Sequence, residues 1–332
     1  MKGFLIEMLE CPVCHGDLNW KIKRCCQDRI EEAEINCKKC SENYSVKEGI
    51  GLFLTPELPR NDLWEELNSQ LSKYLSENPE IKNKLMETPL NNLNPADQFF
   101  RAQILEEEGK FIQAKAVFNL AYSKLYTPDY QKCYQAQINY LKARLSTNKE
   151  PIIDLASGRG ELAEILLRQF TQPIVLTDFS PRVLRQNQKR LKFYGLYEQV
   201  SLLAFDVRRT PFKDRAIKVM TTNLGLPNIE GPDQLLFELR RIIAGDFLAI
   251  SYFFDEDDKE NATFIKESRL DQFLFLRTTL EFFYASGWQV KTENMMLGKV
   301  SPTPASEILE GTRIDTLPLT ETKLKWCVIA AT

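Results

Sequence analysis

The sequence predicts an α/β fold in which a largely parallel sheet, in the second half of the chain, follows a small metal-binding unit and a helical connector. Three observations carry this prediction. Two Cys-x-x-Cys pairs lie within the first 40 residues, a loop with two glycines joins an apolar strand to an amphipathic helix at residues 151–170, and several later apolar segments end in a polar residue. Strands that alternate with helices in this way indicate a parallel sheet.

The composition is that of a folded globular protein with more than one structural unit. A chain of 332 residues exceeds the usual size of a single hydrophobic core. Apolar residues make up 43% of the chain and charged residues 27%, which excludes a disordered or fibrous protein. Because 43 basic residues stand against 46 acidic ones, no overall positive field would draw the whole molecule to nucleic acid.

The first residues do not have the pattern of an export signal. Glu7 and Glu10 interrupt the segment that would form the apolar core of a signal peptide, and no small-residue cleavage site follows them. The longest apolar segments, such as residues 247–254, fall short of the roughly 20 residues that cross a bilayer. We therefore expect a soluble, cytoplasmic protein that has no membrane partner.

The cysteine pairs near the N-terminus predict a structural zinc site. Two residues between paired cysteines allow a tight turn that points both thiolates at one ion, and two such turns complete a tetrahedral site. A disulfide would need an oxidising compartment, and a redox pair would stand alone. The predicted ligands are Cys11, Cys14, Cys37 and Cys40. Cys25 and Cys26 are placed in a hairpin between the turns, where either could replace a ligand, and His15 is expected to be an exposed turn residue.

The whole N-terminal segment follows a recognisable order of motifs. CPVCHGDL, a hairpin, CKKC and a KEGIG turn before an apolar strand resemble the small zinc-ribbon activator family of tRNA and rRNA methyltransferases. The resemblance covers residues 1–56. It implies a ribbon that accompanies a methyltransferase or is fused to one, in which a closed zinc site stabilises a unit too small for a core of its own.

Helical patterns punctuated by proline and asparagine follow the ribbon and predict a connector over residues 57–119. Apolar residues at helical spacing continue across residues 111–145 and indicate two helices joined near Pro128. Five tyrosines recur on these two helices, and they suit either a packed core or a wall beside a substrate or cofactor. They are Tyr122, Tyr126, Tyr130, Tyr134 and Tyr140.

A loop at residues 155–160 has the composition of a ligand-binding turn. It follows an apolar strand that ends in Asp154 and precedes a helix that begins near Glu161. Gly158 and Gly160 allow the backbone to approach a ligand, and the helix N-terminus offers unpaired N–H groups. A dinucleotide-binding loop would read G-x-G-x-x-G, and this loop does not.

Three later strands are expected to end at Asp178, Asp206 and Asn223. A carboxylate at the tip of the second strand of such a sheet can bind both hydroxyls of a ribose. Taken singly, each carboxylate could instead be a helix cap or part of a surface ion pair. Together with Asp154, however, these residues are predicted to meet at one edge of a parallel sheet, which is where ligands bind.

The spacing of Asp154, Ala156, Gly158 and Gly160 resembles motif I of the class I S-adenosylmethionine-dependent methyltransferases, with alanine at the first glycine position. This resemblance covers residues 120–332. It implies a Rossmann-like, seven-stranded class I methyltransferase domain that closes with an antiparallel pair of strands. The zinc ribbon and the helical connector would precede that domain.

The same resemblance implies S-adenosylmethionine as the cofactor. Asp154 would fix its methionine end, Asp178 would hold its ribose and Phe179 would flank its adenine. Asp206 would meet the adenine amino group, and Val207 would add a backbone contact. The full set of candidate cofactor-binding residues is Asp154, Ala156, Ser157, Gly158, Gly160, Asp178, Phe179, Asp206, Val207, Asn223 and Leu224.

Methyl transfer from a sulfonium needs positioning in a dry pocket more than it needs a strong base. No His/Asp or Cys/His constellation is evident, and no catalytic residue is assigned. The segment NLGLPN differs from the Asn/Asp-Pro-Pro-Tyr motif of many base N-methyltransferases, which favours a small or medium-sized acceptor. Two alternatives stay open: an RNA methyltransferase whose ribbon binds rRNA or tRNA, and a non-enzymatic activator or scaffold with a protein partner.

One local charge excess bears on the RNA alternative. Residues 180–218 contain ten Lys or Arg and three acidic residues. Such a patch could face an anionic substrate or RNA, or it could be a solvated helix face.

Overall fold

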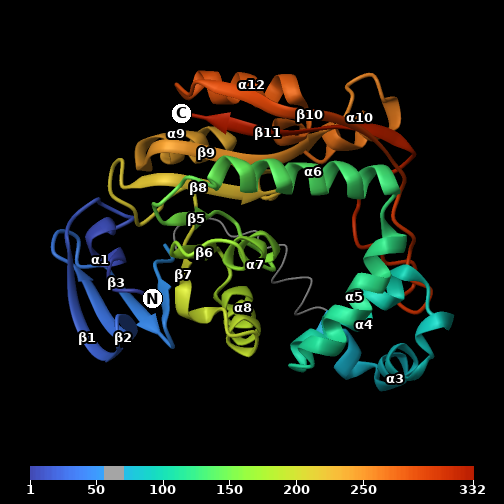
Figure 1. The fold of residues 1–332 in the computed structure, drawn as a ribbon, viewed down its shortest axis with the longest axis horizontal. Helices are drawn as coiled ribbons and strands as arrows, with labels where there is room; N and C mark the ends of the chain where they lie inside the picture. The colour runs from blue at the N-terminus through green and yellow to red at the C-terminus, as the bar shows by residue number, and fades with distance from the viewer. Residues whose placement is uncertain (56–70) are drawn as a thin grey trace.

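The structure is a computed structural model, which describes residues 1–55 and 71–332 (Figure 1). Part of the expected connector, and its expected boundary with the ribbon at residues 56 and 57, lie outside the described residues. The division of the chain into residues 1–56, 57–119 and 120–332 stays a prediction. No helix within the described residues is long and apolar enough to cross a membrane.

Eleven of the described strands form one sheet, in the order β1-β2-β3-β4-β7-β6-β5-β8-β9-β11-β10. Short apolar runs rich in Ile, Val and Leu build its buried centre, as expected for strands that are covered on both faces. The strands are β1 (Leu18–Cys26), β2 (Arg29–Cys37), β3 (Asn43–Lys47), β4 (Ile50–Leu52), β5 (Ile152–Asp154), β6 (Ile174–Asp178), β7 (Val200–Ala204), β8 (Ile217–Asn223), β9 (Ile243–Phe253), β10 (Val290–Val300) and β11 (Thr322–Ala331).

The seven strands from β7 to β10 have the predicted Rossmann-like arrangement. The strands β7, β6, β5, β8 and β9 are parallel, and β11 lies antiparallel between β9 and β10. From β5 the chain builds outwards through β6 to β7 and then crosses to β8 on the other side of β5. This reversal is a topological switch point, and a ligand is expected outside the carboxyl ends of β5 and β8.

The N-terminal ribbon is continuous with this sheet. Its last strand, β4, pairs in parallel with β7, so that Leu52 lies opposite Ala204. The Phe53 N–H extends the ladder by donating to the Ala204 carbonyl at 2.8 Å. A Cβ at Gly51 would lie 2.6 Å from Leu203 Cδ2, so a larger residue there would displace the buried Leu203 side chain. The ribbon therefore covers an edge of the main sheet that would otherwise be unpaired.

Side chains also join the ribbon to the rest of the protein. Leu5, Phe53 and Phe212 are fully buried in one hydrophobic core. The buried Arg29 donates to the Val200 carbonyl at 2.9 Å, and its guanidinium lies 4.0 Å from the centre of the Tyr197 ring. The ribbon thus shares its apolar interior with the main domain, although the cysteine motifs alone predict a separate unit.

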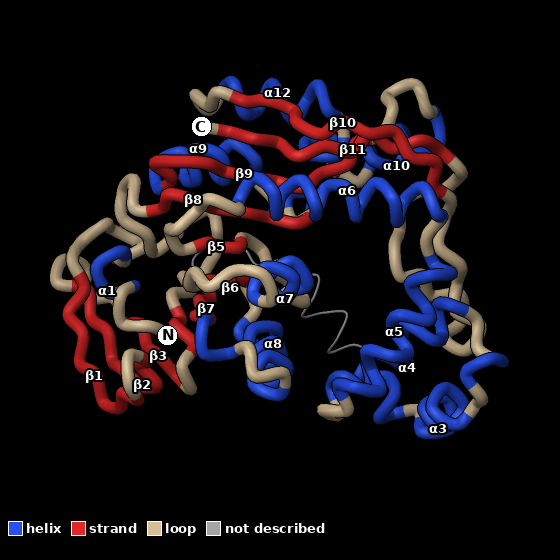
Figure 2. The backbone as a smooth tube through the Cα atoms, in the orientation of Figure 1, coloured by secondary structure: helices blue, strands red, loops and turns tan. Residues whose placement is uncertain are grey.

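Helices cover both faces of the sheet (Figure 2). The core on one face takes side chains from α1, α9 and α12, and the core on the other takes them from α6, α7, α8 and α10. These helices are α1 (Leu5–Met8), α6 (Pro128–Leu145), α7 (Glu161–Leu167), α8 (Pro181–Phe193), α9 (Pro232–Ile242), α10 (Lys259–Glu267) and α12 (Leu276–Ala285), and the short α11 (Asp271–Leu274) precedes α12.

Three complete helices and the helical residues 71–77 form a small bundle with its own core. The complete helices are α3 (Pro79–Glu87), α4 (Pro95–Glu107) and α5 (Phe111–Leu125), and they lie beyond one end of α6 in Figure 1. The long loop between β10 and β11 attaches to this bundle, because the Asp97 carboxylate accepts from the Ser306 hydroxyl and from the Glu307 N–H. The described part of the predicted connector is therefore helical.

Candidate functional site

The predicted strand ends meet at one edge of the sheet. Asp154 ends β5, Asp178 ends β6 and Asn223 ends β8, and Asp206 lies two residues after β7. Because these four strands are parallel neighbours, their carboxyl ends lie side by side. The structure therefore brings together the candidate residues that the sequence placed on separate segments.

The glycine loop follows β5 and needs an unusual backbone. Ala156, Gly158 and Gly160 have φ angles of 49°, 49° and 68°, in the region that favours glycine. A Cβ at Gly160 would lie 3.1 Å from Leu176 Cδ2 and 3.3 Å from Arg190 Nη2, so this position has little room for a side chain. Ala156 adopts the left-handed conformation at the place where the related motif has glycine.

Hydrogen bonds tie the glycine loop to the neighbouring strand. The Ser157 hydroxyl donates to the Asp154 carbonyl at 2.8 Å and accepts from the Thr177 N–H at 3.1 Å. The Gly158 N–H donates to Asp178 Oδ2 at 2.9 Å. Ser157 is thus used in shaping the loop, and its hydroxyl points at the backbone of β5 and β6.

Asp154 is fully buried below the loop. Its Oδ1 accepts from the Thr221 hydroxyl at 2.9 Å. Burial raises the pKa of Asp154 to about 7, although the bonds from Thr221 and Ser157 oppose the shift, and the nearby charge of Asp178 raises it further. A carboxyl group that titrates near neutrality at the switch point is typical of a functional site.

Asp178 and Asp206 are engaged differently. Asp178 accepts from the Ser180 N–H at 2.9 Å as well as from Gly158, and so it holds the start of α8 beside the glycine loop. Asp206 accepts from the Arg208 side chain at 3.0 Å (Nε) and 2.7 Å (Nη2). Phe179 and Val207, which follow these two carboxylates, are partly exposed at the same edge.

Asn223 and Leu224 end the site on the side of β8. The Asn223 Nδ2 donates to the Tyr134 hydroxyl at 2.9 Å, whereas the buried Asn223 Oδ1 has no partner among the described residues. Leu224 has a φ of 56° and is partly exposed. The sequence singled out Tyr134 only as part of a tyrosine row, and the structure places its hydroxyl beside a candidate cofactor contact.

Glu106, which no sequence signal marked, connects the helical bundle to the glycine loop. It lies at the end of α4 and is 8% exposed. Its carboxylate accepts from Arg159 in the loop and from Arg190 Nη1 on α8, the latter at 2.8 Å, and its carbonyl accepts from Gln186 Nε2 at 2.6 Å. Arg190 also donates to the Arg159 carbonyl. One buried carboxylate therefore bridges two arginines that fix the loop from outside.

The four predicted zinc ligands form one cluster. The sulfur atoms of Cys11, Cys14, Cys37 and Cys40 all lie within 4.8 Å of one another. Cys11 Sγ lies 3.6 Å from Cys40 Sγ, and Cys14 Sγ lies 3.4 Å from Cys37 Sγ. The predicted hairpin is confirmed, since Cys25 and Cys26 end β1 next to the turn into β2 and are exposed. His15 lies in a separate turn, where its Nδ1 contacts Glu10 at 2.7 Å.

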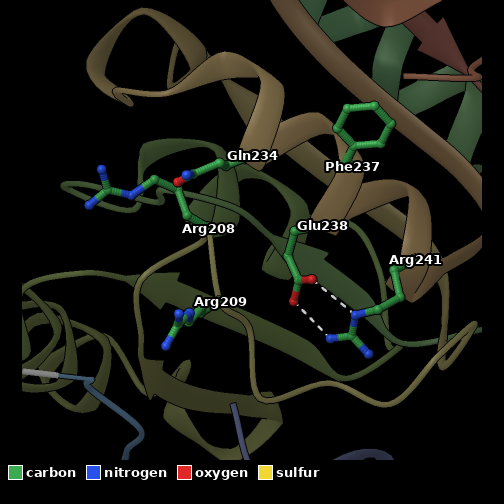
Figure 3. Close-up of a pocket in the computed structure, with 6 residues that line it drawn as sticks. All are labelled: Arg208, Arg209, Gln234, Phe237, Glu238 and Arg241. Atoms are coloured by element: carbon green, nitrogen blue, oxygen red, sulfur yellow. Dashed lines mark hydrogen bonds and ion pairs between the residues drawn. The ribbon is translucent and has the colours of Figure 1, made fainter. Parts of the chain in front are cut away.

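Two of the ten Lys and Arg residues in the range 180–218 form ion pairs within the protein. Arg190 pairs with Glu106, and Arg208 pairs with Asp206. A pocket of about 410 Å³ lies between the Arg208–Arg209 turn and α9. Figure 3 shows that Arg241 at its rim is bound to Glu238, which comes from the same helix.

Two family models match the chain. Residues 152–246 match a model described as a methyltransferase domain, and residues 2–49 match the model of the Trm112p-like proteins. The first range contains the glycine loop and all four strand ends, and the second contains the four clustered cysteines. The chain thus carries a methyltransferase domain behind a Trm112p-like ribbon, as the two resemblances predicted.

Curated relatives match a segment that makes up 28% of the chain. A ubiquinone/menaquinone biosynthesis C-methyltransferase (UbiE) of Cupriavidus metallidurans is 34% identical over 96 residues, which make up 28% of this chain and 39% of that protein. A demethylmenaquinone methyltransferase of Lactobacillus johnsonii is 27% identical over 96 residues, with the same coverage. The chain therefore spans about two fifths of the length of these relatives.

Solved structures show a weaker similarity. The YcgJ protein of Bacillus subtilis is 16% identical with a TM-score of 0.47, and the match covers 59% of this chain and 97% of that one. A geranyl diphosphate C-methyltransferase of Streptomyces coelicolor is 13% identical with a TM-score of 0.43, covering 59% and 78% of the two chains. The strand order, and not this similarity, is the evidence for the fold.

Replacing Glu106 with glutamine should loosen the glycine loop. The change removes the buried counter-charge of Arg159 and the nearer of the two carboxylates at Arg190, which keeps Glu164 Oε2 at 3.7 Å from its Nε. Breaking a buried ion pair costs about 3 kcal/mol or more. We expect that loss in urea unfolding, together with faster amide exchange at residues 158–160. Glu108→Gln is the matched control, since Glu108 forms only partly exposed pairs with Lys82 and Lys110. Equal losses in the two variants would contradict the bridging role.

Proposed function

We propose that this protein, which carries a methyltransferase domain behind a Trm112p-like ribbon, transfers a methyl group from S-adenosylmethionine to a small-molecule acceptor. The observation that carries the proposal is the common edge formed by Asp154, Asp178, Asp206 and Asn223 around the glycine loop. The names of the curated relatives refer to methylation in ubiquinone and menaquinone biosynthesis, which supports a small-molecule acceptor rather than RNA.

The residues at this edge suit the cofactor. The unpartnered Asn223 Oδ1 is a buried acceptor that a ligand N–H or O–H would satisfy. Gly158 and Gly160 adopt the left-handed backbone that glycine favours, which shapes the loop beside the proposed cofactor. Asp178 would hold the ribose, and Asp154 would bind the ammonium of the methionine end. The cofactor would supply an activated methyl group, so the protein's task is to orient it and to exclude water.

The cysteine cluster suits zinc. Zinc bound to four thiolates at about 2.3 Å in a tetrahedron would place the sulfur atoms about 3.8 Å apart. The distances of 3.6 Å and 3.4 Å between paired sulfur atoms are close to that value. Backbone N–H groups of Lys39 and Cys40 point at Cys37 Sγ, and these bonds favour the thiolate although burial opposes it. We infer a closed structural site that holds the ribbon against β7.

The Asp178→Ala variant tests the cofactor assignment. Loss of a carboxylate that binds two ribose hydroxyls removes two charge-assisted hydrogen bonds, each worth about 1.5 to 3 kcal/mol. We expect the affinity for S-adenosylmethionine, measured by calorimetry, to fall at least about a hundredfold. Asp233→Ala, at an exposed position in the first turn of α9, is the control. Unchanged affinity in a folded Asp178→Ala protein would refute the proposal.

Acidification should weaken cofactor binding while it stabilises the free protein. The pKa of Asp154 is raised to about 7. Between about pH 4 and pH 7 the folded state therefore keeps a proton that the unfolded state has released. The contribution of Asp154 to stability is therefore full at low pH and lost as the pH rises through 7. Affinity for the cofactor ammonium should fall roughly tenfold between pH 7 and 5.5, because only the ionised carboxylate pairs with it.

Calorimetry and urea unfolding across this pH range check both directions. The Asp154→Asn variant, which cannot ionise, should show no such fall in affinity over the same range. A pH profile shared by both proteins would assign the titration to another group.

Removal of the metal should affect the main sheet as well as the ribbon. Metal analysis should find one zinc per chain, and Cys14→Ser should lose it whereas Cys25→Ser, at the exposed hairpin, should keep it. After chelation we expect faster amide exchange in β7, because β4 no longer covers its edge. β10, at the opposite edge of the sheet, serves as the internal reference. Unchanged protection of β7 would show that the ribbon does not support the domain.

A further inference from the structure

The tyrosine row forms a continuous set of ring contacts along α5 and α6. The ring centres of Tyr122 and Tyr126 lie 5.1 Å apart, and those of Tyr126 and Tyr130 lie 4.4 Å apart in a stacked arrangement. Trp326 on β11 continues the row, at 5.0 Å from Tyr130 and 6.3 Å from Tyr134. The row is thus an aromatic wall that is built from two helices and the sheet.

This wall borders the proposed cofactor site. Tyr134 accepts a hydrogen bond from Asn223 at the end of β8. Burial raises the pKa of the Tyr122, Tyr126 and Tyr134 hydroxyls, and the charge of Glu161 in the first turn of α7 raises each of them further. Tyr140 is separate, because its hydroxyl donates to Glu293 on β10 at 2.7 Å.

At the other end of the wall the structure contains a small cavity. Its volume is about 30 Å³, and its lining includes the rings of Tyr126, Tyr130, Tyr252 and Phe254. The one carboxylate in the lining comes from Asp315, in the long loop between β10 and β11. Tyr126 donates to Asp315 Oδ2 at 2.8 Å, and no other side chain among the described residues binds this carboxylate. Burial raises the pKa of Asp315, and the Tyr126 hydroxyl opposes that shift.

We propose that this cavity is the subsite that receives a hydroxyl group of the methyl acceptor, with Asp315 accepting its hydrogen bond while the apolar body of the acceptor lies outside the cavity. The inference rests on the proposed methyltransferase function and adds to it the place and the chemical class of the acceptor. A carboxylate enclosed by aromatic rings selects a ligand that is apolar over most of its surface and carries a donor at one point.

The size of the cavity and the arrangement of its rings favour a hydroxyl over a cationic group. A volume of about 30 Å³ is close to the share of one water molecule, so it admits an O–H but no alkylated ammonium. Tyr126 and Tyr130 stack on each other with their planes 16° apart. Their facing surfaces are therefore covered and do not form the open aromatic cage that binds a cation.

The test compares two probes that differ only in the donor. 2-Naphthol and 2-methoxynaphthalene are titrated into the full-length protein by calorimetry, with and without S-adenosylhomocysteine. We expect 2-naphthol to bind more tightly than its methyl ether. Asp315→Asn should weaken 2-naphthol about tenfold, as expected for loss of a hydrogen bond to a charged group, and should leave 2-methoxynaphthalene and S-adenosylhomocysteine unchanged.

Two further variants separate binding from folding. Glu307→Gln changes an exposed carboxylate in the same loop and should alter no affinity. Tyr126→Phe removes the hydroxyl that occupies Asp315 but keeps the carboxylate, so it should bind 2-naphthol at least as tightly as the unmodified protein. Equal affinity for the two probes, or a tenfold loss in Tyr126→Phe as well, would overturn the subsite. Failure of the unmodified protein to bind S-adenosylhomocysteine would instead refute the proposed function.

Discussion

The carboxylate of Asp178 holds together the two loops on which the candidate site depends. It accepts from the Gly158 N–H in the glycine loop and from the Ser180 N–H at the start of α8. Without it, two buried donors would lack partners, and the left-handed backbone of the loop would lose the contact that fixes it. A residue proposed to bind ribose is therefore also the residue that shapes the loop. For this reason, affinity and local order at this edge have to be measured together.

A second constraint acts on the outer edge of the sheet. A parallel strand such as β7 cannot end a sheet without exposing a row of backbone groups, and here β4 of the ribbon pairs with it. The shared core around Phe53 and Phe212 adds apolar burial to this pairing. The metal proposed at the cysteine cluster would order the ribbon and, through β4, also the strand that precedes Asp206. This gives the cysteines a role in the domain without any chemistry of their own.

The sequence was sufficient to predict the parts of the fold that follow from a fixed residue spacing or a hydrophobic period. The cysteine pairs predicted the cluster, and the strand ends at residues 154, 178, 206 and 223 predicted the common edge, because parallel order forces such ends together. Contacts between distant segments were not predictable. Glu106 reaches Arg190 across 84 positions of sequence, and Arg29 reaches Val200 across 171. No local pattern records which carboxylate or arginine finds such a partner.

The tyrosine row shows why one pattern could not be decided from the sequence. Helical spacing of aromatic residues is satisfied equally by a core and by the wall of a site, because both require one apolar face. The hydrogen-bond partners of the hydroxyls distinguish the two cases. Tyr126 is hydrogen-bonded to Asp315, Tyr134 to Asn223 and Tyr140 to the distant Glu293. In a purely structural core each buried carboxylate or amide would be fully satisfied. Here the buried Asn223 Oδ1, next to the Tyr134 hydroxyl, has no partner among the described residues, so this end of the row borders an acceptor that a ligand N–H or O–H would satisfy.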